Sequence, residues 1–434
     1  MTVLLYALGV VLFVIGLAAS IGLHEMGHLV PAKRFGAKVT QYFIGFGPTL
    51  WSRTRGETEY GVKGLPLGGY VKIVGMFPPA KGDESGQVRN SNTGVFSQLI
   101  SDARAAEWEH VKPGDENRLF YQLPWWKKVV VMAGGPSVNL VLAFLLFGSV
   151  FAVHGVSEPT ATVASVSDCV IAVRVDEEPR SCTASDPVSP AAKAGLEPGD
   201  TILSFNGTRV SSYRNLQEMI RSNRDGAAVL VVERDGKTRE LRTNTAVNTV
   251  FADLDTADKG TTQAGFLGIV PKFEMVRHGP IFTLMEMGTM TKKAVHTIAT
   301  FPVKVYGVGK AALGLEKRDP ESPMSVVGAS RVAGEISSSH QLDVGEKLAT
   351  LLMLLGAVNL FLGLFNFVPL LPLDGGHIAG ALYEAVRRGL ARVRGRPDPG
   401  HVDVAKLLPV AYVVALAFLV MTAILVYADV VAPV

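Results

Sequence analysis

The chain has 434 residues, of which 48% are hydrophobic and 19% are charged, and its mean hydropathy is positive. This composition is too apolar for an ordinary soluble globular protein and is typical of a membrane protein with substantial aqueous parts. The net charge of only +3 leaves no electrostatic footprint for nucleic acid, so we expect no nucleic-acid partner.

Four apolar segments are long enough to cross a bilayer, which requires about 20 residues. They run from Val3 to about Val30, from Val129 to Val153, from Leu348 to about Leu371, and from Leu407 to Tyr427. Lysine and arginine gather after the first segment and between the third and the fourth, so the positive-inside rule places both connections in the cytoplasm. Residues 154–347 and both termini are then expected outside.

The first apolar segment could instead be a signal peptide, because residues 17–20 read Leu-Ala-Ala-Ser and resemble a cleavage site. The segment lacks a basic n-region, however, and Lys33 and Arg34 follow it closely. Those flanks oppose export, so we expect a retained membrane span.

The first span ends in the pattern H-E-x-x-H, formed by His24, Glu25 and His28. On a helix, positions i and i+4 share a face, so both imidazoles can hold one zinc ion while Glu25 lies beside a metal-bound water. Ionisable residues at the edge of a span are costly and usually functional. Two histidines at a helix surface are the simpler alternative. The metal site is favoured because the pattern is complete and follows directly from an apolar span.

Residues 36–77 alternate loosely between apolar and polar positions, with glycine breaks, and predict a hairpin or small sheet close to the membrane. Open sheet edges cannot face lipid, so this region should pack beside the helices or line a wet cavity. It either offers an edge to which an extended substrate segment adds, or it is a scaffold that caps the active site. The sequence favours neither alternative. The polar residues 78–126 predict a cytoplasmic connection without chemistry.

The second span contains the run Ala-Gly-Gly-Pro-Ser-Val-Asn at residues 133–139. Small residues allow helices to approach closely in a bilayer, so packing is the first expectation for this run. Asn139 is polar at membrane depth and can hydrogen-bond either a neighbouring helix or a substrate strand.

Residues 155–271 predict an aqueous module of short helices and strands that resembles a PDZ domain. The signature Ala-Gly-Leu-Glu-Pro-Gly-Asp stands at 194–200 and leads into a strand. PDZ domains capture a chain terminus at a glycine-rich loop by strand addition. The loop comes last here, as in circularly permuted bacterial PDZ domains. Alternatively, the module blocks access by bulk alone. The residues of the candidate loop are Gly265, Phe266, Leu267 and Gly268.

The two cysteines of the chain, Cys169 and Cys182, both fall in this outward module. An oxidising compartment would permit a disulfide between them, whereas two free thiols are the alternative. The sequence does not show which of the two is present.

The third span ends in Asn-Phe-Val-Pro-Leu-Leu-Pro-Leu-Asp-Gly-Gly-His at residues 366–377. Prolines and glycines break the helix there, and broken backbone at membrane depth survives only where protein or a wet cavity satisfies it. Asp374 is therefore expected to be buried, and a third zinc ligand is the economical explanation. The charge-derived topology puts it on the same side as His24 and His28. A helix-ending turn residue is the alternative for Asp374, and we expect no direct role for His377.

These motifs together resemble the site-2 protease family of intramembrane zinc metalloproteases, in particular the actinobacterial branch that acts in regulated intramembrane proteolysis. The resemblance rests on H-E-x-x-H, the PDZ-like insert and the Asn-x-x-Pro-x-x-Pro-Leu-Asp-Gly-Gly run. It is strengthened by Gly-Phe-Gly-Pro-Thr-Leu-Trp at 45–51 and Met-Ser-Val-Val-Gly-Ala-Ser at 324–330. The fold class it implies is a polytopic α-helical membrane protein with four transmembrane helices, a membrane-associated β-hairpin or sheet and one inserted extracytoplasmic PDZ domain.

The resemblance also implies a mechanism and a partner class. Zn²⁺ would be held by His24, His28 and Asp374, with Glu25 as the base and Asn366 stabilising the oxyanion. The substrates would be single-pass anti-sigma factors in the lipid bilayer of the bacterial inner membrane, already trimmed outside by another protease. The PDZ domain would exclude untrimmed substrate.

Two other function classes remain open on the sequence. Histidines and an acid in membrane spans also suit a metal transporter, although transport needs neither the base Glu25 nor a PDZ domain. A non-catalytic PDZ scaffold with a structural zinc is the second alternative.

The predicted organisation divides the chain into nine consecutive segments. They are the first span 1–35, the β region 36–77, the cytoplasmic connection 78–126, the second span 127–154, the PDZ domain 155–271, an interfacial helical segment 272–346, the third span 347–376, a basic cytoplasmic loop 377–405 and the fourth span 406–434.

Overall fold

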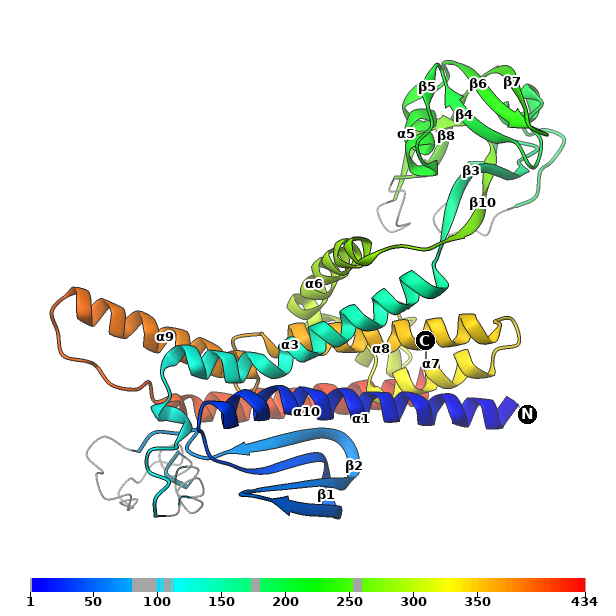
Figure 1. Ribbon diagram of the computed structural model, residues 1–434. Coiled ribbons are helices and arrows are strands. Elements are labelled where there is room, and N and C mark those ends of the chain that lie inside the picture. Colours follow the sequence, from blue (N-terminus) through cyan, green and yellow to red (C-terminus); the bar gives the residue numbers. More distant parts are fainter. Residues whose placement is uncertain are drawn as a thin grey trace. The chain divides into compact units, whose positions relative to one another are not determined.

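The computed structural model describes residues 2–79, 100–102, 104, 111, 113–172, 180–252 and 260–433. Most of the predicted cytoplasmic connection 78–126 therefore lies outside the described residues. The chain forms two compact units (Figure 1). Unit 1 comprises residues 1–154 and 279–434, and unit 2 comprises residues 155–278.

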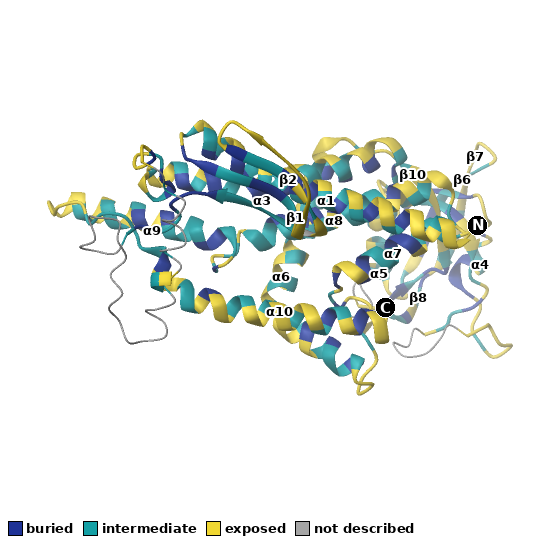
Figure 2. Cartoon of the chain, turned by 90° about the horizontal axis from the view of Figure 1, so that it is seen from below, coloured by how far each residue is buried: buried dark blue, intermediate teal, exposed yellow. Residues whose placement is uncertain are grey.

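Four helices of the described residues are long and apolar enough to cross a membrane, which confirms a polytopic membrane protein. Much of α10 is exposed, as Figure 2 shows, and side chains such as Leu416 and Leu419 present an apolar surface suited to lipid. The four helices are α1 (Thr2–Arg34), α3 (Trp125–Ser149, continued by η2, Val150–His154), α8 (Val344–Asn366) and α10 (Leu408–Val431, preceded by η4, Val404–Leu407).

The end of the third span differs from the sequence prediction. Helix α8 stops at Asn366 instead of about Leu371, because the chain turns through the proline-containing residues 367–373. A new helix, α9 (Asp374–Val393), then begins where a basic loop was expected from 377. The buried residues of α9 are Gly375, Gly376, Ala381 and Glu384, so only a narrow side of the helix is buried. Because this amphipathic helix carries many arginines, the sequence predicted a loop instead.

Helices α1 and α3 cross at very short range. A Cβ atom on Gly134 would lie 1.9 Å from the carbonyl oxygen of Gly27, and a Cβ atom on Gly27 would lie 2.5 Å from that of Gly134. Only glycine at both positions allows this approach, which is the physical reason for the small residues at the start of the second span.

The β region is a sheet of two long, bent strands, β1 (Val39–Arg55) and β2 (Thr58–Ile73). Tyr42 lies opposite both Tyr60 and Val71, and Gly61 lies opposite both Phe43 and Ser52. The bent strands therefore contribute four paired segments, which is the small sheet rather than the simple hairpin of the two forms expected. The Tyr42 hydroxyl donates to the Gly22 carbonyl of α1 at 2.7 Å, which fixes the sheet against the helix. The order of the segments across the sheet is 69–73, 39–44, 58–62 and 51–55.

The described part of unit 1 also includes the helices α6 (Pro280–Ala312) and α7 (Val326–Ser338) and the short η1 (Phe120–Gln122). The C-terminal part of α6 packs on α10 through Val305 and Val308. Helix α7 lies against the N-terminal half of α1, where a Cβ atom on Gly9 would lie 2.5 Å from the carbonyl oxygen of Ala333.

Unit 2 is built on a sheet with the strand order β10-β3-β4-β6-β7, in which β5 pairs with β4, while β8 and β9 pair separately. Its core gathers Leu216, Ile220, Leu230 and Leu267 around the sheet and α5. The elements are β3 (Val156–Val166), α4 (Pro190–Ala194), β4 (Thr201–Phe205), β5 (Thr208–Arg209), α5 (Tyr213–Asn223), β6 (Ala227–Arg234), β7 (Lys237–Asn244), β8 (Ala246–Phe251), β9 (Thr261–Phe266) and β10 (Ile269–Val276).

The 194–200 signature has a structural explanation in this unit. Gly195 ends α4 in the left-handed conformation, with φ of 72°. Asp200 is buried, which would raise the pKa of its carboxyl, but hydrogen bonds from Arg234 and from the backbone of Glu197 lower that pKa. Cys169 and Cys182 form a disulfide, which resolves the alternative left open by the sequence.

Candidate metal centre and active site

The last turns of α1 bring His24 and His28 onto one face. Their Nε2 atoms lie 3.2 Å apart. The Nδ1 of His28 donates to the carbonyl oxygen of Val131 on α3 at 2.8 Å. Because this hydrogen bond fixes the proton on Nδ1, the Nε2 lone pair of His28 is free to bind a metal.

Asp374, the first residue of α9, completes the group. Its Oδ2 atom lies 3.4 Å from the Nε2 of His24 and 3.4 Å from the Nε2 of His28. That oxygen is buried and has no hydrogen-bond partner in the described part of the chain. The tight turn before it depends on glycine, since a Cβ atom on Gly375 would lie 2.1 Å from the carbonyl oxygen of Val368.

The spacing of these three ligand atoms suits zinc. Tetrahedral coordination with metal–ligand distances of about 2.0–2.2 Å places neighbouring ligand atoms about 3.3–3.6 Å apart. The separations of 3.2, 3.4 and 3.4 Å lie close to that range. A buried carboxylate oxygen without a donor also requires a cation nearby. His24, His28 and Asp374 could therefore hold a zinc ion. Among the described residues, their ligand atoms all lie within 4.8 Å of one another, close enough to share one metal.

Space for the histidine rings comes from a glycine on α3. A Cβ atom on Gly135 would lie 2.2 Å from the Nε2 of His28 and 2.8 Å from the Cε1 of His24. Any side chain at this position would displace the atoms that face Asp374. The sequence suggested only helix packing for this glycine, because nothing in a linear pattern shows which ring a glycine faces.

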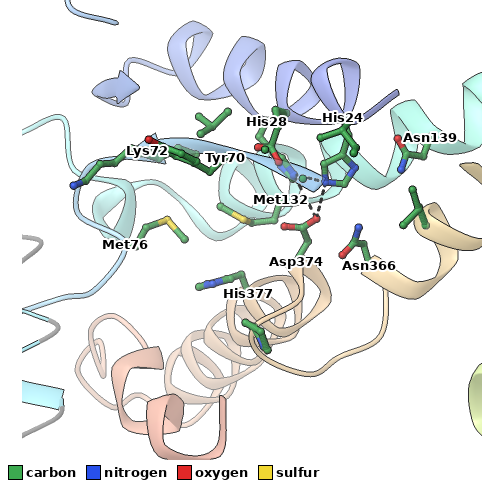
Figure 3. Close-up of a pocket in the computed structure, with 18 residues that line it drawn as sticks. His24, His28, Tyr70, Lys72, Met76, Met132, Asn139, Asn366, Asp374 and His377 are labelled. Carbon is green, nitrogen blue, oxygen red and sulfur yellow. Dashed lines mark hydrogen bonds and ion pairs between the residues drawn. The ribbon is translucent and has the colours of Figure 1, made fainter. Parts of the chain in front are cut away.

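A cavity of about 500 Å³ surrounds the three ligands (Figure 3). Asn139 and Asn366 lie on one side of the ligand group, and Lys72 and Met76 lie on the other. His377 also lines the cavity but does not belong to the candidate ligand group. Sequence reasoning missed several lining residues that carry no motif, namely Tyr70, Lys72, Met76 and Met132.

The side chain of Asn139 is almost fully buried in α3, and its Oδ1 has no hydrogen-bond partner among the residues described. The sequence left two partners open for Asn139, a neighbouring helix or a substrate strand. Its Oδ1 makes no hydrogen bond to a neighbouring helix among the described residues. Asn366 is the last residue of α8 and faces the same cavity. Two amide side chains thus lie beside the candidate metal centre.

The first sheet segment, 69–73, forms one wall of the cavity and has one unpaired edge among the described strands. The segment lies close to the candidate base, and both Val71 and Glu25 line the cavity. Gly69 also approaches closely, since its Cβ atom would lie 3.0 Å from the Cγ of Glu25. Because strands repeat every two residues, the backbone groups of Gly69, Val71 and Ile73 share this edge.

The candidate peptide loop of unit 2 is largely engaged in packing. Leu267 is only 2% exposed, and its carbonyl oxygen accepts from the backbone N–H of Ala191 at 2.8 Å. Gly265 abuts α5, because its Cβ atom would lie 2.0 Å from the carbonyl oxygen of Ile220. Phe266 ends β9, and Gly268 connects it to β10 with φ of 91°.

Unit 2 also contains a cavity of about 680 Å³, which lies between the start of α5 and strand β10. The sequence did not predict the residues that line this cavity, because only the folded structure shows that one face of α5 lies beside the edge of β10. Its lining residues include Tyr213, Gln217, Val270 and Phe273.

Comparison with known proteins agrees with this geometry. The family described as Peptidase family M50 matches residues 12–397. Zinc metalloprotease Rip1 of Mycobacterium tuberculosis is 34% identical over 450 residues, which cover 99% of each chain. Rip1 of Mycolicibacterium smegmatis is 33% identical and covers 95% of this chain and 94% of its own. Metalloprotease MmpA of Caulobacter vibrioides is 27% identical over 87% of this chain and 86% of its own.

The matched region includes α3, α8, the start of α9 and most of α1, and therefore every residue of the candidate metal centre. A full-length relative above 30% identity and a family match over most of the chain agree on the class of enzyme. The chain therefore belongs to peptidase family M50, the site-2 protease family of zinc metalloproteases embedded in membranes.

Proposed function

We propose that the protein hydrolyses peptide bonds within the transmembrane segments of single-pass membrane proteins, with zinc held by His24, His28 and Asp374. The observation that carries the proposal is the convergence of these three ligand atoms, 3.2–3.4 Å apart, on a cavity that also holds Glu25 and a free sheet edge. Zinc, when bound, supplies Lewis-acid polarisation of water and of the scissile carbonyl.

The chain's own residues supply the remaining chemistry. Glu25 accepts a proton from the attacking water and returns it to the leaving amine. The Asn366 amide donates a hydrogen bond to the oxyanion that develops on the carbonyl oxygen. Asn139, whose Oδ1 lacks a partner within the described chain, accepts from a substrate backbone N–H.

The free edge of residues 69–73 holds the substrate. A helical segment buries its scissile carbonyl in a backbone hydrogen bond, so it must unwind before attack. Once extended, it can add to the sheet as a further strand beside Val71, which places its backbone next to Glu25. Strand addition also satisfies the unwound backbone at a depth where water is scarce.

The substrates in this proposal are anti-sigma factors already trimmed on the outer face of the bacterial inner membrane. The class is supported by the resemblance of the motifs to the branch that acts in regulated intramembrane proteolysis. The basic residues around α9 support a cytoplasmic position for the connection after α8 and an outer position for unit 2.

Unit 2, in this proposal, is a PDZ domain that selects trimmed substrate by its new chain terminus. The support is an edge strand, β10, beside the amphipathic α5, with a cavity between them. An extended peptide would pair with β10 and place side chains against Tyr213 and Phe273. The disulfide between Cys169 and Cys182 is consistent with an oxidising outer compartment.

Glu25→Gln should retain zinc but reduce cleavage of a transmembrane substrate by about a thousandfold, because the ligands stay intact while the proton acceptor is lost. Zinc content of the purified protein and cleavage in proteoliposomes measure the two properties. In cells, membrane stubs that accumulate only with the Glu25→Gln enzyme would identify the substrates, and anti-sigma factors are expected among them. Near-normal cleavage by the variant would remove Glu25 from its role.

Gly135→Ala should lower zinc affinity by more than about tenfold, since the added methyl group would overlap the His28 ring. Gly148→Ala is the matched control on the same helix, because its Cβ atom would meet Thr283 only at an ordinary 3.6 Å. Chelator competition measures both affinities. Equal zinc affinity of the two variants would show that the histidine rings do not depend on the space at Gly135.

Val71→Pro should reduce cleavage strongly without loss of zinc, because proline removes the N–H at the free sheet edge and prevents strand addition there. Val71→Ala keeps that N–H and should cleave almost normally. The measurement is turnover of a transmembrane substrate together with zinc content. Unchanged turnover by the proline variant would favour the alternative in which the sheet merely caps the site.

Phe273→Ser should weaken binding of a peptide with a free C-terminal carboxylate by roughly tenfold, because the variant removes an apolar contact from the cavity in unit 2. Met275→Ser is the matched control, since Met275 lies two residues along the same strand, is similarly exposed and does not line the cavity. Titration of the full-length protein in detergent with a labelled peptide measures both. A peptide that binds neither parent nor variants would favour exclusion by bulk.

A further inference from the structure

We propose that the buried ion pair between Lys128 and Glu384 is a positioning element that holds the Asp374 carboxylate opposite the two histidines. The inference rests on the proposed metal centre and adds two residues that make no contact with the metal or the substrate. Lys128 lies in the first turn of α3, and Glu384 lies in the middle of α9.

The pair is more deeply buried than a surface salt bridge. The Nζ of Lys128 donates to the Oε2 of Glu384 at 2.9 Å, and the side chains are 8% and 2% exposed. The backbone N–H of Val402 donates to the same carboxylate at 3.0 Å. Burial would raise the pKa of Glu384, but His401, whose Nδ1 lies 3.4 Å from the Oε1 of Glu384, and the hydrogen bond from Lys128 lower it to about 2, so the carboxylate is charged at neutral pH.

Such a pair contributes little net stability by itself. The cost of removing two charges from water often equals or exceeds their mutual attraction, and an apolar pair of similar volume frequently stabilises a fold as well. The best-attested role of buried ionic groups is to select one relative position of two packed helices among several of similar energy. The Lys128–Glu384 pair would select the position of α9 along α3.

The helix that carries Lys128 also orients both histidines. Val131, about one turn after Lys128, accepts the hydrogen bond from the Nδ1 of His28. Gly135, about two turns after Lys128, provides the space for the rings of His24 and His28. Helix α3 is thus the common reference for the imidazole ligands.

Helix α9 carries the third ligand at its first residue and Glu384 further along the same continuous helix. Its other fully buried residues are Gly375, Gly376 and Ala381, and the partly buried Ile378 packs against the apolar cluster that contains Val131 of α3, which leaves Glu384 as the longest fully buried side chain of α9. The Oδ2 of Asp374 has no hydrogen bond in the described structure that would hold it before metal arrives. The Lys128–Glu384 pair therefore fixes the axial position of α9, and with it the Asp374 carboxylate.

The test is zinc affinity of the full-length protein in detergent, measured by competition with a chelator. Glu384→Gln and Lys128→Met should each weaken zinc binding by roughly tenfold, in the range seen when groups behind metal ligands are changed. Lys128→Arg keeps the charge and should stay near the parent value. Glu335→Gln is the control, because it removes a carboxylate from a half-exposed pair with Arg331 on α7.

Folded Glu384→Gln and Lys128→Met proteins that bind zinc as tightly as the parent would overturn the inference. Should Glu384→Gln fail to fold, the double variant Lys128→Met/Glu384→Leu removes both charges together, and it too should bind zinc less tightly. A parent protein that binds no zinc would contradict the proposed metal centre itself. Zinc binding by the parent that no variant changes would contradict only the positioning role.

Discussion

The close crossing of α1 and α3 is the constraint on which the rest of the structure depends. Glycines at 27 and 134 let the two backbones meet, and Gly135 leaves room for two imidazole rings between them. The carbonyl oxygen of Val131 then fixes the ring of His28. One helix pair thus sets both the helix packing and the orientation of the candidate ligands, so a change to the crossing is also a change to the candidate metal centre.

The third candidate ligand and the proposed substrate-binding edge come to this helix pair from separate parts of the chain. The broken chain after α8 brings Asp374 to the histidines, while the bent sheet brings its 69–73 edge to Glu25. Both are irregular or open backbone that lines the cavity, and a membrane tolerates such backbone only where protein buries it or where it lines a water-filled cavity. The features that look costly in lipid are therefore the ones to which we assign catalysis and substrate binding in the proposed function.

The sequence predicted those parts of the molecule that depend on local periodicity or on a compact motif. Four apolar runs predicted four spans, and the i, i+4 spacing of His24 and His28 put them on one face. Asp374 followed from a carboxylate in broken backbone. Three features could not be predicted, because each depends on which distant segment a residue meets. They are the pairing of Tyr42 with two strand segments, the helix that begins at Asp374, and the position of Gly135 against the histidine rings.

X-ray absorption at the zinc edge of the full-length protein tests the central claim most directly, since it reports the atoms around the metal. The account predicts two imidazole nitrogens and one carboxylate oxygen at about 2.0–2.2 Å, with an oxygen from solvent in the fourth place. Asp374→Cys should replace one oxygen neighbour of zinc by a sulfur at about 2.3 Å, which this method distinguishes from nitrogen and oxygen. Zinc that shows no sulfur neighbour in Asp374→Cys and binds as tightly as in the parent would contradict the account, because residue 374 would then lie outside the set of ligands.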